Sequence, residues 1–223
     1  MISVIIPARN SEKTIKSSIL SVLNQGIDDL EIICILNGCT DNTESEVLSL
    51  KDPRIRIAYS SEGIVPALNE GLRISKGEFI ARQDADDFWF ENKLKKQLNF
   101  LDINKEIDIL GTQMSVVDGS YRHIRNTNYP LTHKEIANHL LNSENPIGHP
   151  SVIFRRRVLD KCAGYFDLFP FAEDMDLWAR SIPWFKFANL SDILVRYTHV
   201  PNSSYNPRVP STLSSWYRII YGI

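Results

Sequence analysis

The sequence contains few cysteines, almost no net charge and no long apolar run. Its three cysteines show neither CxxC spacing nor the density of a secreted disulfide scaffold, which favours a reducing compartment such as the cytoplasm. The formal net charge of −2 provides no general attraction for nucleic acid, so nucleic-acid binding is disfavoured. Since no run of about 18 apolar residues occurs, no transmembrane helix is expected, and any membrane attachment would be peripheral.

What the first half of the sequence does contain is short apolar runs that alternate with helical patterns. Strands are predicted at 2–6, 32–36, 55–58 and 78–82, and helices at 15–23, 44–50 and 65–74. Nearly continuous apolar strands that alternate with helices predict an α/β fold, whose parallel sheet is covered on both faces. After residue 87 the pattern loosens into mixed structure, with helices near 92–104 and 133–142, strands at 107–113 and 193–197, and a hairpin turn at 118–119. We expect one domain over residues 1–210 and a tail at 211–223.

Polar residues follow three of these predicted strands. They are Arg9-Asn10, the segment 37–41 and the segment 84–87. In open α/β sheets, ligands bind beyond the carboxyl ends of the strands. The three segments are therefore expected to meet at one rim of the sheet, although they lie far apart in the sequence.

Three carboxylates crowd the segment Asp84-Ala85-Asp86-Asp87, directly after an apolar strand. Their mutual repulsion must be relieved by protonation, solvent or a cation. Oxygen ligands suit Mg²⁺ or Mn²⁺, which proteins usually hold with one or two carboxylates while substrate phosphates complete the shell. The position at a strand end favours a metal site that binds a diphosphate. The alternative is a solvated acidic turn that caps the following helix.

A second acidic cluster, Glu173-Asp174-Met175-Asp176-Leu177-Trp178, opens a predicted helix. Acids at a helix N-terminus can simply oppose the helix dipole, and taken alone the cluster favours that structural role. The functional alternative is a carboxylate that faces the metal site and accepts the proton of an attacking hydroxyl.

These segments, taken together and in this order, resemble the family 2 glycosyltransferases, which have the GT-A fold. The opening strand Ser3-Val4-Ile5-Ile6-Pro7 with Asn10 resembles the first strand of that family, and the segments 37–43, 67–71 and 77–82 continue the match. Asp84-Ala85-Asp86-Asp87 falls on the DxD position of the family, and Glu173-Asp174 falls on the acidic motif that carries its catalytic base. The resemblance implies a Rossmann-like, mostly parallel central sheet flanked by helices. It also implies a nucleotide-binding half at 1–104 and a mixed acceptor-side half at 105–210.

The resemblance implies an inverting, metal-dependent hexosyltransferase of polysaccharide, lipopolysaccharide or other glycan synthesis. Asp174 would be the general base, Asp86 would ligate Mn²⁺ or Mg²⁺, and Asp84 would lie against the ribose or the metal shell. The expected donor is a nucleotide-diphosphate sugar, with a UDP-sugar favoured, and the acceptor is a glycan or a lipid-linked hydroxyl. Further residues expected to bind the nucleotide-sugar are Pro7, Arg9, Asn10, Asn37, Asn69, Arg82 and Ala85. His149 and Glu173 are expected on the acceptor side, and His199 is a further candidate for contact with the metal or diphosphate.

Two positions depart from the family pattern. Leu36-Asn37 stands where the family often has aspartates that help to recognise the nucleobase, which leaves the identity of the base open. Asn37 still offers one acceptor and two donors to a pyrimidine edge. Arg9 replaces a common aromatic residue, and it can stack on the base, reach a phosphate or lie on the surface as a structural residue.

Two other classes of protein compete with this interpretation. A sugar nucleotidylyltransferase would share the alternating fold and the metal, but it would have a glycine-rich phosphate loop where this chain has Pro7-Ala8-Arg9-Asn10. A non-catalytic nucleotide-sugar-binding or glycan-binding domain would need no second carboxylate site.

The Gln-x-x-Arg-Trp motif and membrane helices of processive synthases are missing, which favours single addition. The aromatic and basic segment 215–221 suits contact with the inner face of a membrane, and its alternative is packing against the domain or a partner chain.

Overall fold

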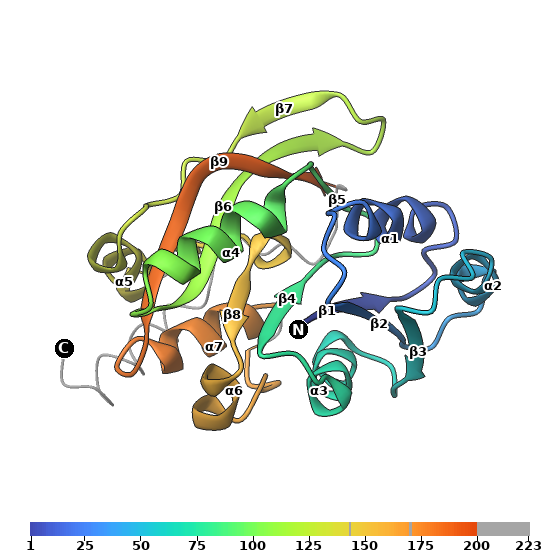
Figure 1. The fold of residues 1–223 in the computed structure, drawn as a ribbon, viewed down its shortest axis with the longest axis horizontal. Coiled ribbons are helices and arrows are strands. Elements are labelled where there is room, and N and C mark those ends of the chain that lie inside the picture. The colour runs from blue at the N-terminus through green and yellow to red at the C-terminus, as the bar shows by residue number, and fades with distance from the viewer. Residues whose placement is uncertain (143, 170, 200–223) are drawn as a thin grey trace.

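One mixed sheet runs through the computed structural model, which describes residues 1–142, 144–169 and 171–199 (Figure 1). Its strands are β1 (Ile2–Ala8), β2 (Leu30–Leu36), β3 (Ile55–Tyr59), β4 (Phe79–Arg82), β5 (Phe88–Trp89), β6 (Ile107–Asp118), β7 (His123–Asn126), β8 (Ile153–Arg155) and β9 (Lys186–His199). They lie in the order β3-β2-β1-β4-β8-β6-β9-β5, and β7 pairs with β6. The helices are α1 (Ile15–Leu23), α2 (Thr43–Leu48), α3 (Ile64–Ile74), α4 (Lys93–Ile103), α5 (His133–Leu141), α6 (Arg157–Cys162) and α7 (Glu173–Ser181), with a 3₁₀ helix η1 at His149–Ser151.

Strands β1 to β4 form the parallel part of the sheet that the alternating pattern predicts. β1 pairs in parallel with β2 on one side and with β4 on the other, and β2 pairs in parallel with β3. Beyond β4 the pairing is mixed, because β8 is antiparallel to β4 and β6 whereas β6 and β9 are parallel. The predicted α/β fold is confirmed, with a parallel first half and a mixed second half.

The least predictable elements lie in the second half. β9 begins at Lys186, well before the predicted strand at 193–197, and pairs with β6 along its length through several register shifts. Polar residues such as Asn189 and Asp192 interrupt its apolar pattern, so the pairing partner defines the strand more than local composition does. β8 and α6 have only three and six residues and were not predicted.

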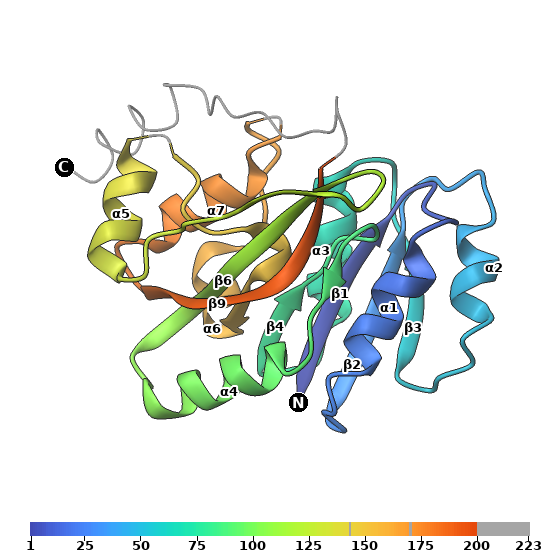
Figure 2. The ribbon, with the colours of Figure 1, turned by 90° about the horizontal axis from the view of Figure 1, so that it is seen from above.

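Helices cover both faces of the sheet, as the buried strands require. α1, α2 and α4 pack on one face, and α3, α5, α6 and α7 pack on the other (Figure 2). Along β1 the side chains alternate between these two cores, so that Val4 and Ile6 face α1 whereas Ile5 faces α3. All seven residues of β1 and all seven of β2 are buried, which explains their nearly continuous apolar character.

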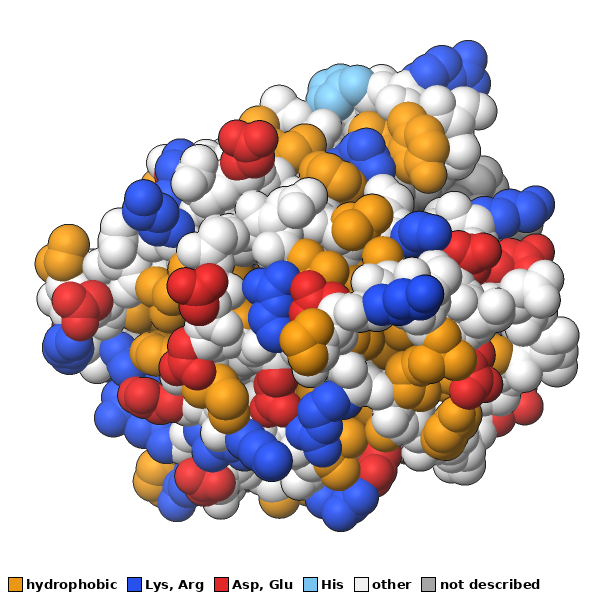
Figure 3. All heavy atoms as spheres, turned by 45° about the vertical axis from the view of Figure 1, so that its right-hand side comes forward, with side chains coloured by type: hydrophobic (Ala, Val, Ile, Leu, Met, Phe, Trp, Pro, Cys, Tyr) orange, Lys and Arg blue, Asp and Glu red, His pale blue; other side chains and the backbone are white. Residues whose placement is uncertain are grey.

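The surface carries acidic and basic side chains in close alternation. Figure 3 shows them interspersed over one face of the molecule, in keeping with a net charge of −2. Within residues 1–142, 144–169 and 171–199, no helix combines the length and the apolar character that crossing a bilayer requires.

Gly77, between α3 and β4, marks a close approach of two backbone segments. A Cβ atom at this position would lie 2.5 Å from the backbone nitrogen of Ser3 and 2.8 Å from the carbonyl oxygen of Phe79. We therefore expect Gly77→Ala to lower the free energy of unfolding by about 1–3 kcal/mol, as overpacking does elsewhere. The matched control is Gly119→Ala in the β6–β7 turn, where a Cβ atom meets nothing within 4 Å. Urea unfolding of both variants checks this, and equal stability of the two would contradict it.

Candidate active site

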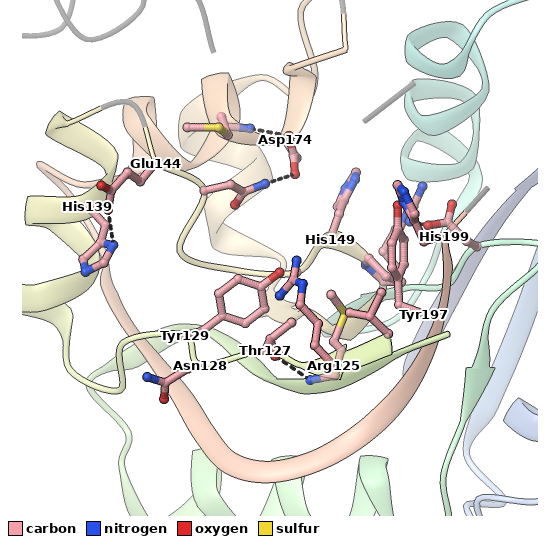
Figure 4. Close-up of a pocket in the computed structure, with 18 of the residues that line it drawn as sticks. Arg125, Thr127, Asn128, Tyr129, His139, Glu144, His149, Asp174, Tyr197 and His199 are labelled. Carbon is pink, nitrogen blue, oxygen red and sulfur yellow. Dashed lines mark hydrogen bonds and ion pairs between the residues drawn. The ribbon is translucent and has the colours of Figure 1, made fainter. Parts of the chain in front are cut away.

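A cavity of 580 Å³ opens beyond the carboxyl end of β4. Its walls come from the end of β4, the β6–β7 hairpin, the loop before η1, the start of α7 and the end of β9 (Figure 4). The residues predicted from the sequence that line it are Arg82, Asp84, His149, Glu173, Asp174 and His199. Both acidic clusters therefore contribute carboxylates to the same cavity, although they lie far apart in the sequence.

The segment 84–87 is held between α1 and β9. The hydroxyl of Ser18 on α1 donates to the carbonyl of Asp84 over 2.7 Å. From the other side, the hydroxyl of Thr198 donates to the carbonyl of Asp86, and the backbone N–H of Thr198 donates to the carboxylate of Asp87, both over 2.8 Å. These bonds fix the acidic loop and bring the neighbouring His199 to the cavity.

The carboxylates of this loop lie in an electrostatically crowded position. The guanidinium of Arg82, only 6% exposed, forms an ion pair with Asp84. Burial, and next the negative charge of Asp84, raise the pKa of Asp86 to about 6. The pKa of the buried Asp87 is raised well above its usual value by burial and by both neighbouring carboxylates. One arginine leaves this negative charge incompletely neutralised, so the loop attracts a proton or a cation.

The donor atoms of this loop fit a hard divalent ion better than they fit zinc. In the described part of the chain, no group of three His, Cys, Asp or Glu side chains is arranged to hold a metal. Mg²⁺ and Mn²⁺ do not need such a cage, because one or two carboxylates and substrate phosphates suffice. Asp84 lines the cavity, and the charge of Asp86 acts on Tyr197, which lines it as well. These two aspartates can therefore hold a metal only together with a phosphate-bearing ligand.

Asp174 lines the cavity from the first turn of α7. Its carboxylate accepts a hydrogen bond of 3.0 Å from the side-chain amide of Asn145 and one of 2.7 Å from the backbone N–H of Met175. Burial raises the pKa of Asp174, whereas these two hydrogen bonds and Arg82 lower it. Burial, and next the charge of Asp174, raise the pKa of Glu173 to about 7. The two neighbouring carboxyls thus differ in environment: Asp174 accepts hydrogen bonds that favour its ionised form, whereas burial and the charge of Asp174 favour the protonated form of Glu173.

His149 forms the floor of the cavity between the two acidic clusters. Its Nε2 lies 2.9 Å from the hydroxyl of Tyr165, and its ring meets the edge of Trp178. Burial, and next the charge of Arg82, hold the pKa of His149 well below its usual value. His149 is therefore a buried group of the cavity whose neutral form is favoured.

The loops after β1 and β2 meet at the same rim of the sheet, as predicted. The side-chain oxygen of Asn10 accepts from the backbone N–H of Thr40 over 2.8 Å. The Asn37 amide donates to the carbonyl of Gly63 at 3.5 Å, while its buried Oδ1 has no partner among the described residues. Arg9 is half-exposed and forms an ion pair with Glu62.

Several predicted nucleotide-binding residues do not line the cavity. Pro7, Arg9, Asn10 and Asn37 lie at the rim just described, and Ala85 is buried in the core beneath the acidic loop. Asn69 lies elsewhere: its amide donates to the carbonyl of Tyr165 and accepts from the N–H of the same residue, over 2.8 and 2.9 Å. Both polar atoms of this side chain thus tie α3 to the segment before α7, which gives Asn69 a structural role.

The structure adds residues that the sequence did not single out. Asn145 orients Asp174, Tyr165 binds His149, and Thr198 anchors the acidic loop. Asp176, the last acid of the second cluster, pairs with Arg180 over 2.6 Å and holds α7 in place. The clustering of Asn145 with Pro146, Gly148 and His149 in one loop was the available signal, but contact with residues far along the chain cannot be read from spacing.

Comparison with solved structures identifies the fold. The chain superimposes on S. aureus TarS 1–349 in complex with UDP-GlcNAc with a TM-score of 0.76 and 23% identity, covering 91% of this chain and 60% of that one. It superimposes on the mannosyltransferase PcManGT from Pyrobaculum calidifontis, in complex with GDP-Man and Mn²⁺, with a TM-score of 0.68 and 19% identity, covering 92% and 58% of the two chains. The fold is that of the GT-A glycosyltransferases, as the resemblance implied.

Sequence comparison identifies the family. The family model described as glycosyl transferase family 2 matches residues 3–163. An uncharacterised glycosyltransferase of Haemophilus influenzae is 33% identical over 88% of this chain and 65% of its own. The Escherichia coli protein WfgD, a UDP-Glc:α-D-GlcNAc-diphosphoundecaprenol β-1,3-glucosyltransferase, is 32% identical over 80% of this chain and 68% of its own. The chain thus spans about two thirds of the length of these relatives, and it belongs to glycosyl transferase family 2.

The hydrogen bond from Asn145 predicts how the activity will depend on pH. Asn145→Ala removes a donor that favours the ionised form of Asp174, so the pKa of Asp174 rises. If Asp174 must be ionised to act, the acidic limb of the pH profile of kcat/KM moves to higher pH. Activity below neutral pH should then fall about tenfold, because one charge-assisted hydrogen bond contributes about that much. Asn145→Asp should move the limb in the same direction. Asn138→Ala, at an exposed position of α5, is the control, and an unmoved limb in both Asn145 variants would refute the assignment.

Proposed function

We propose that this chain transfers a sugar from a nucleotide-diphosphate sugar to an acceptor hydroxyl, with inversion at the anomeric carbon. The observation that best supports this proposal is that Asp84, just after β4, and Asp174, at the start of α7, line the same cavity. A diphosphate site at Asp84 and a base at Asp174 leave the space between them for the anomeric carbon and the attacking hydroxyl. A non-catalytic binding domain would have no need for the second carboxylate.

The nucleobase of the donor belongs at the rim formed after β1 and β2. Asn37 is 5% exposed, and its Oδ1 is a buried acceptor without a partner among the described residues. Such an acceptor is costly unless a ligand satisfies it, and the N–H of a uracil ring would do so. A UDP-sugar is therefore the favoured donor, and the complex of TarS with UDP-GlcNAc supports this choice.

Asp84 and Asp86 are the residues that would hold Mn²⁺ or Mg²⁺. When bound, this ion supplies positive charge beside the leaving diphosphate. PcManGT was solved with GDP-Man and Mn²⁺, which supports a divalent metal for the family. Arg82 forms an ion pair with Asp84, and the hydroxyls of Ser18 and Thr198 hold the backbone carbonyls of Asp84 and Asp86.

Asp174 acts as the general base in this proposal. Burial raises the pKa of Asp174, and the hydrogen bonds from Asn145 and Met175 and the charge of Arg82 oppose that rise and favour the ionised form. The acceptor hydroxyl gives its proton to the Asp174 carboxylate as its oxygen attacks the anomeric carbon. The bond to the diphosphate breaks on the opposite face, so no covalent intermediate with the protein forms.

A lipid-linked acceptor is the substrate class that we favour. WfgD acts on a GlcNAc diphosphoundecaprenol, in which the acceptor sugar is joined to its lipid by a diphosphate. An acceptor of this kind would bring the chain to the inner face of the membrane. The product would serve the synthesis of a cell-envelope polysaccharide.

Replacement of a metal-binding carboxylate tests the donor site. We expect Asp86→Asn to abolish the gain in nucleotide-sugar affinity that Mn²⁺ provides, because a neutral amide is a poor ligand for a hard cation. Isothermal titration with UDP-sugars, with Mn²⁺ or with a chelator, measures this gain. Asp160→Asn, at an exposed position of α6, is the control. Full donor binding and activity in chelator would exclude the metal site.

Replacement of the base should separate transfer from binding. Asp174→Asn keeps the shape of the side chain and leaves the metal-binding loop intact, so donor affinity should stay within a few-fold of wild type. The rate of transfer should fall roughly a hundred- to ten-thousand-fold, which is the usual contribution of a general base. Release of nucleotide diphosphate measures transfer, and the exposed Asp167→Asn is the control. An equal loss of donor affinity would reassign Asp174 to the donor site.

A further inference from the structure

Arg125, on β7, is a positively charged residue of the cavity that has no role in the proposed donor site or in the proposed base. Of the described residues that line the cavity, Arg82 and Arg125 carry a permanent positive charge. Arg82 is buried and engaged with Asp84, whereas Arg125 is exposed. Within residues 1–142, 144–169 and 171–199, the Arg125 guanidinium forms no ion pair or side-chain hydrogen bond. Figure 4 shows it rising from the hairpin into the space that Asp174 and His149 also face.

Hydrogen bonds between β6 and the segment 125–129 hold the backbone that carries Arg125. Arg125 pairs with Val116 of β6, and the next residues along the chain are fixed by Thr127, whose hydroxyl accepts from the backbone N–H of Met114 over 2.7 Å. The buried amide of Gln113 then accepts from the N–H of Tyr129 and donates to its carbonyl. A guanidinium on such a fixed base binds an anion at a smaller entropic cost than one on a loose loop.

The rest of the cavity would repel an anionic acceptor. Carboxylates of Asp84, Glu173 and Asp174 line its walls, and the carboxylate of Glu144 is already paired with His139 over 2.6 Å. A diphosphate that enters from the acceptor side therefore needs a cation where it rests. Arginine suits this task, because its planar fork of N–H groups matches phosphate oxygens.

Exposed apolar side chains stand at the same cavity. Ile124, beside Arg125, and Phe171, before α7, both line it and are 51% and 59% exposed. A lipid chain that leaves a diphosphate held by Arg125 would pass such side chains and remove them from water. The cavity thus combines a carboxylate, a cation and exposed apolar side chains.

We propose that Arg125 binds the diphosphate of a lipid-linked acceptor and so places the acceptor sugar against Asp174. This inference rests on the proposed function for its acceptor, but it assigns a subsite distinct from the metal-assisted donor site. Arg125 acts here as a specificity residue that selects acceptors joined to their lipid through a diphosphate.

Binding of a simple amphiphile tests the subsite without knowledge of the acceptor sugar. Decyl diphosphate and the neutral decyl glucoside are titrated into the protein in EDTA, so that no metal-assisted diphosphate site contributes. Wild type should bind decyl diphosphate at least tenfold more tightly than decyl glucoside. Arg125→Ala should lose this preference, because a charge-assisted contact with phosphate contributes about tenfold or more, and Arg125→Lys should restore part of it.

Arg122→Ala is the matched control on the same hairpin. Arg122 is exposed and pairs with Asp118 over 2.9 Å, and it is not among the residues that line the cavity. Its substitution should leave the preference for decyl diphosphate unchanged. Thermal unfolding checks that all three variants are folded.

Three results would overturn the assignment. They are no preference for decyl diphosphate in wild type, an unchanged preference in Arg125→Ala, and an equal loss of UDP affinity in Mn²⁺ in that variant, which would place Arg125 at the donor. Failure of the proposed function is measured separately: in that case the wild-type protein would neither bind nor cleave any nucleotide-sugar. The decyl diphosphate titration decides the role of Arg125 in either case.

Discussion

The buried guanidinium of Arg82 is the positive charge on which both halves of the site depend. It pairs directly with Asp84, and it lowers the pKa of Asp86, Glu173 and Asp174 at the same time. Its positive charge opposes burial, which is the main cause that raises the pKa of all three acids. Burial, and next the charge of Arg82, also hold the pKa of the neighbouring His149 well below its usual value. The donor wall and the acceptor wall are therefore coupled through one side chain.

The sheet places this cation where both walls can use it. Arg82 is the last residue of β4, the strand at which the parallel half meets the antiparallel β8. On one side the parallel strands β1 and β2 end in loops that meet at one rim of the sheet. On the other side the mixed strands carry the loop of Asn145 and the hairpin of Arg125. The change from parallel to antiparallel pairing thus falls at the strand whose last residue pairs with Asp84.

The sequence predicts the donor side of this arrangement far better than the acceptor side. Alternating apolar runs define β1 to β4, and parallel strands place the polar residues after them at one rim, so Asn10 and Thr40 were expected to meet. No comparable rule links Asn145 to Asp174, because that contact depends on how α7 packs against a loop outside regular structure. Asn69 shows the opposite failure: a family position suggested ligand binding, whereas the amide bonds the backbone of Tyr165.

Two acids of the site have pKa values close to neutral pH, so their protonation responds to a bound charge. They are Asp86, with a pKa of about 6, and Glu173, with a pKa of about 7. A cation that binds the acidic loop displaces a proton there and adds positive charge to the cavity, which favours ionisation of the acids facing it. In the proposed function the diphosphate of the donor would bring compensating negative charge, so the metal and the diphosphate together would set the net field at Asp174.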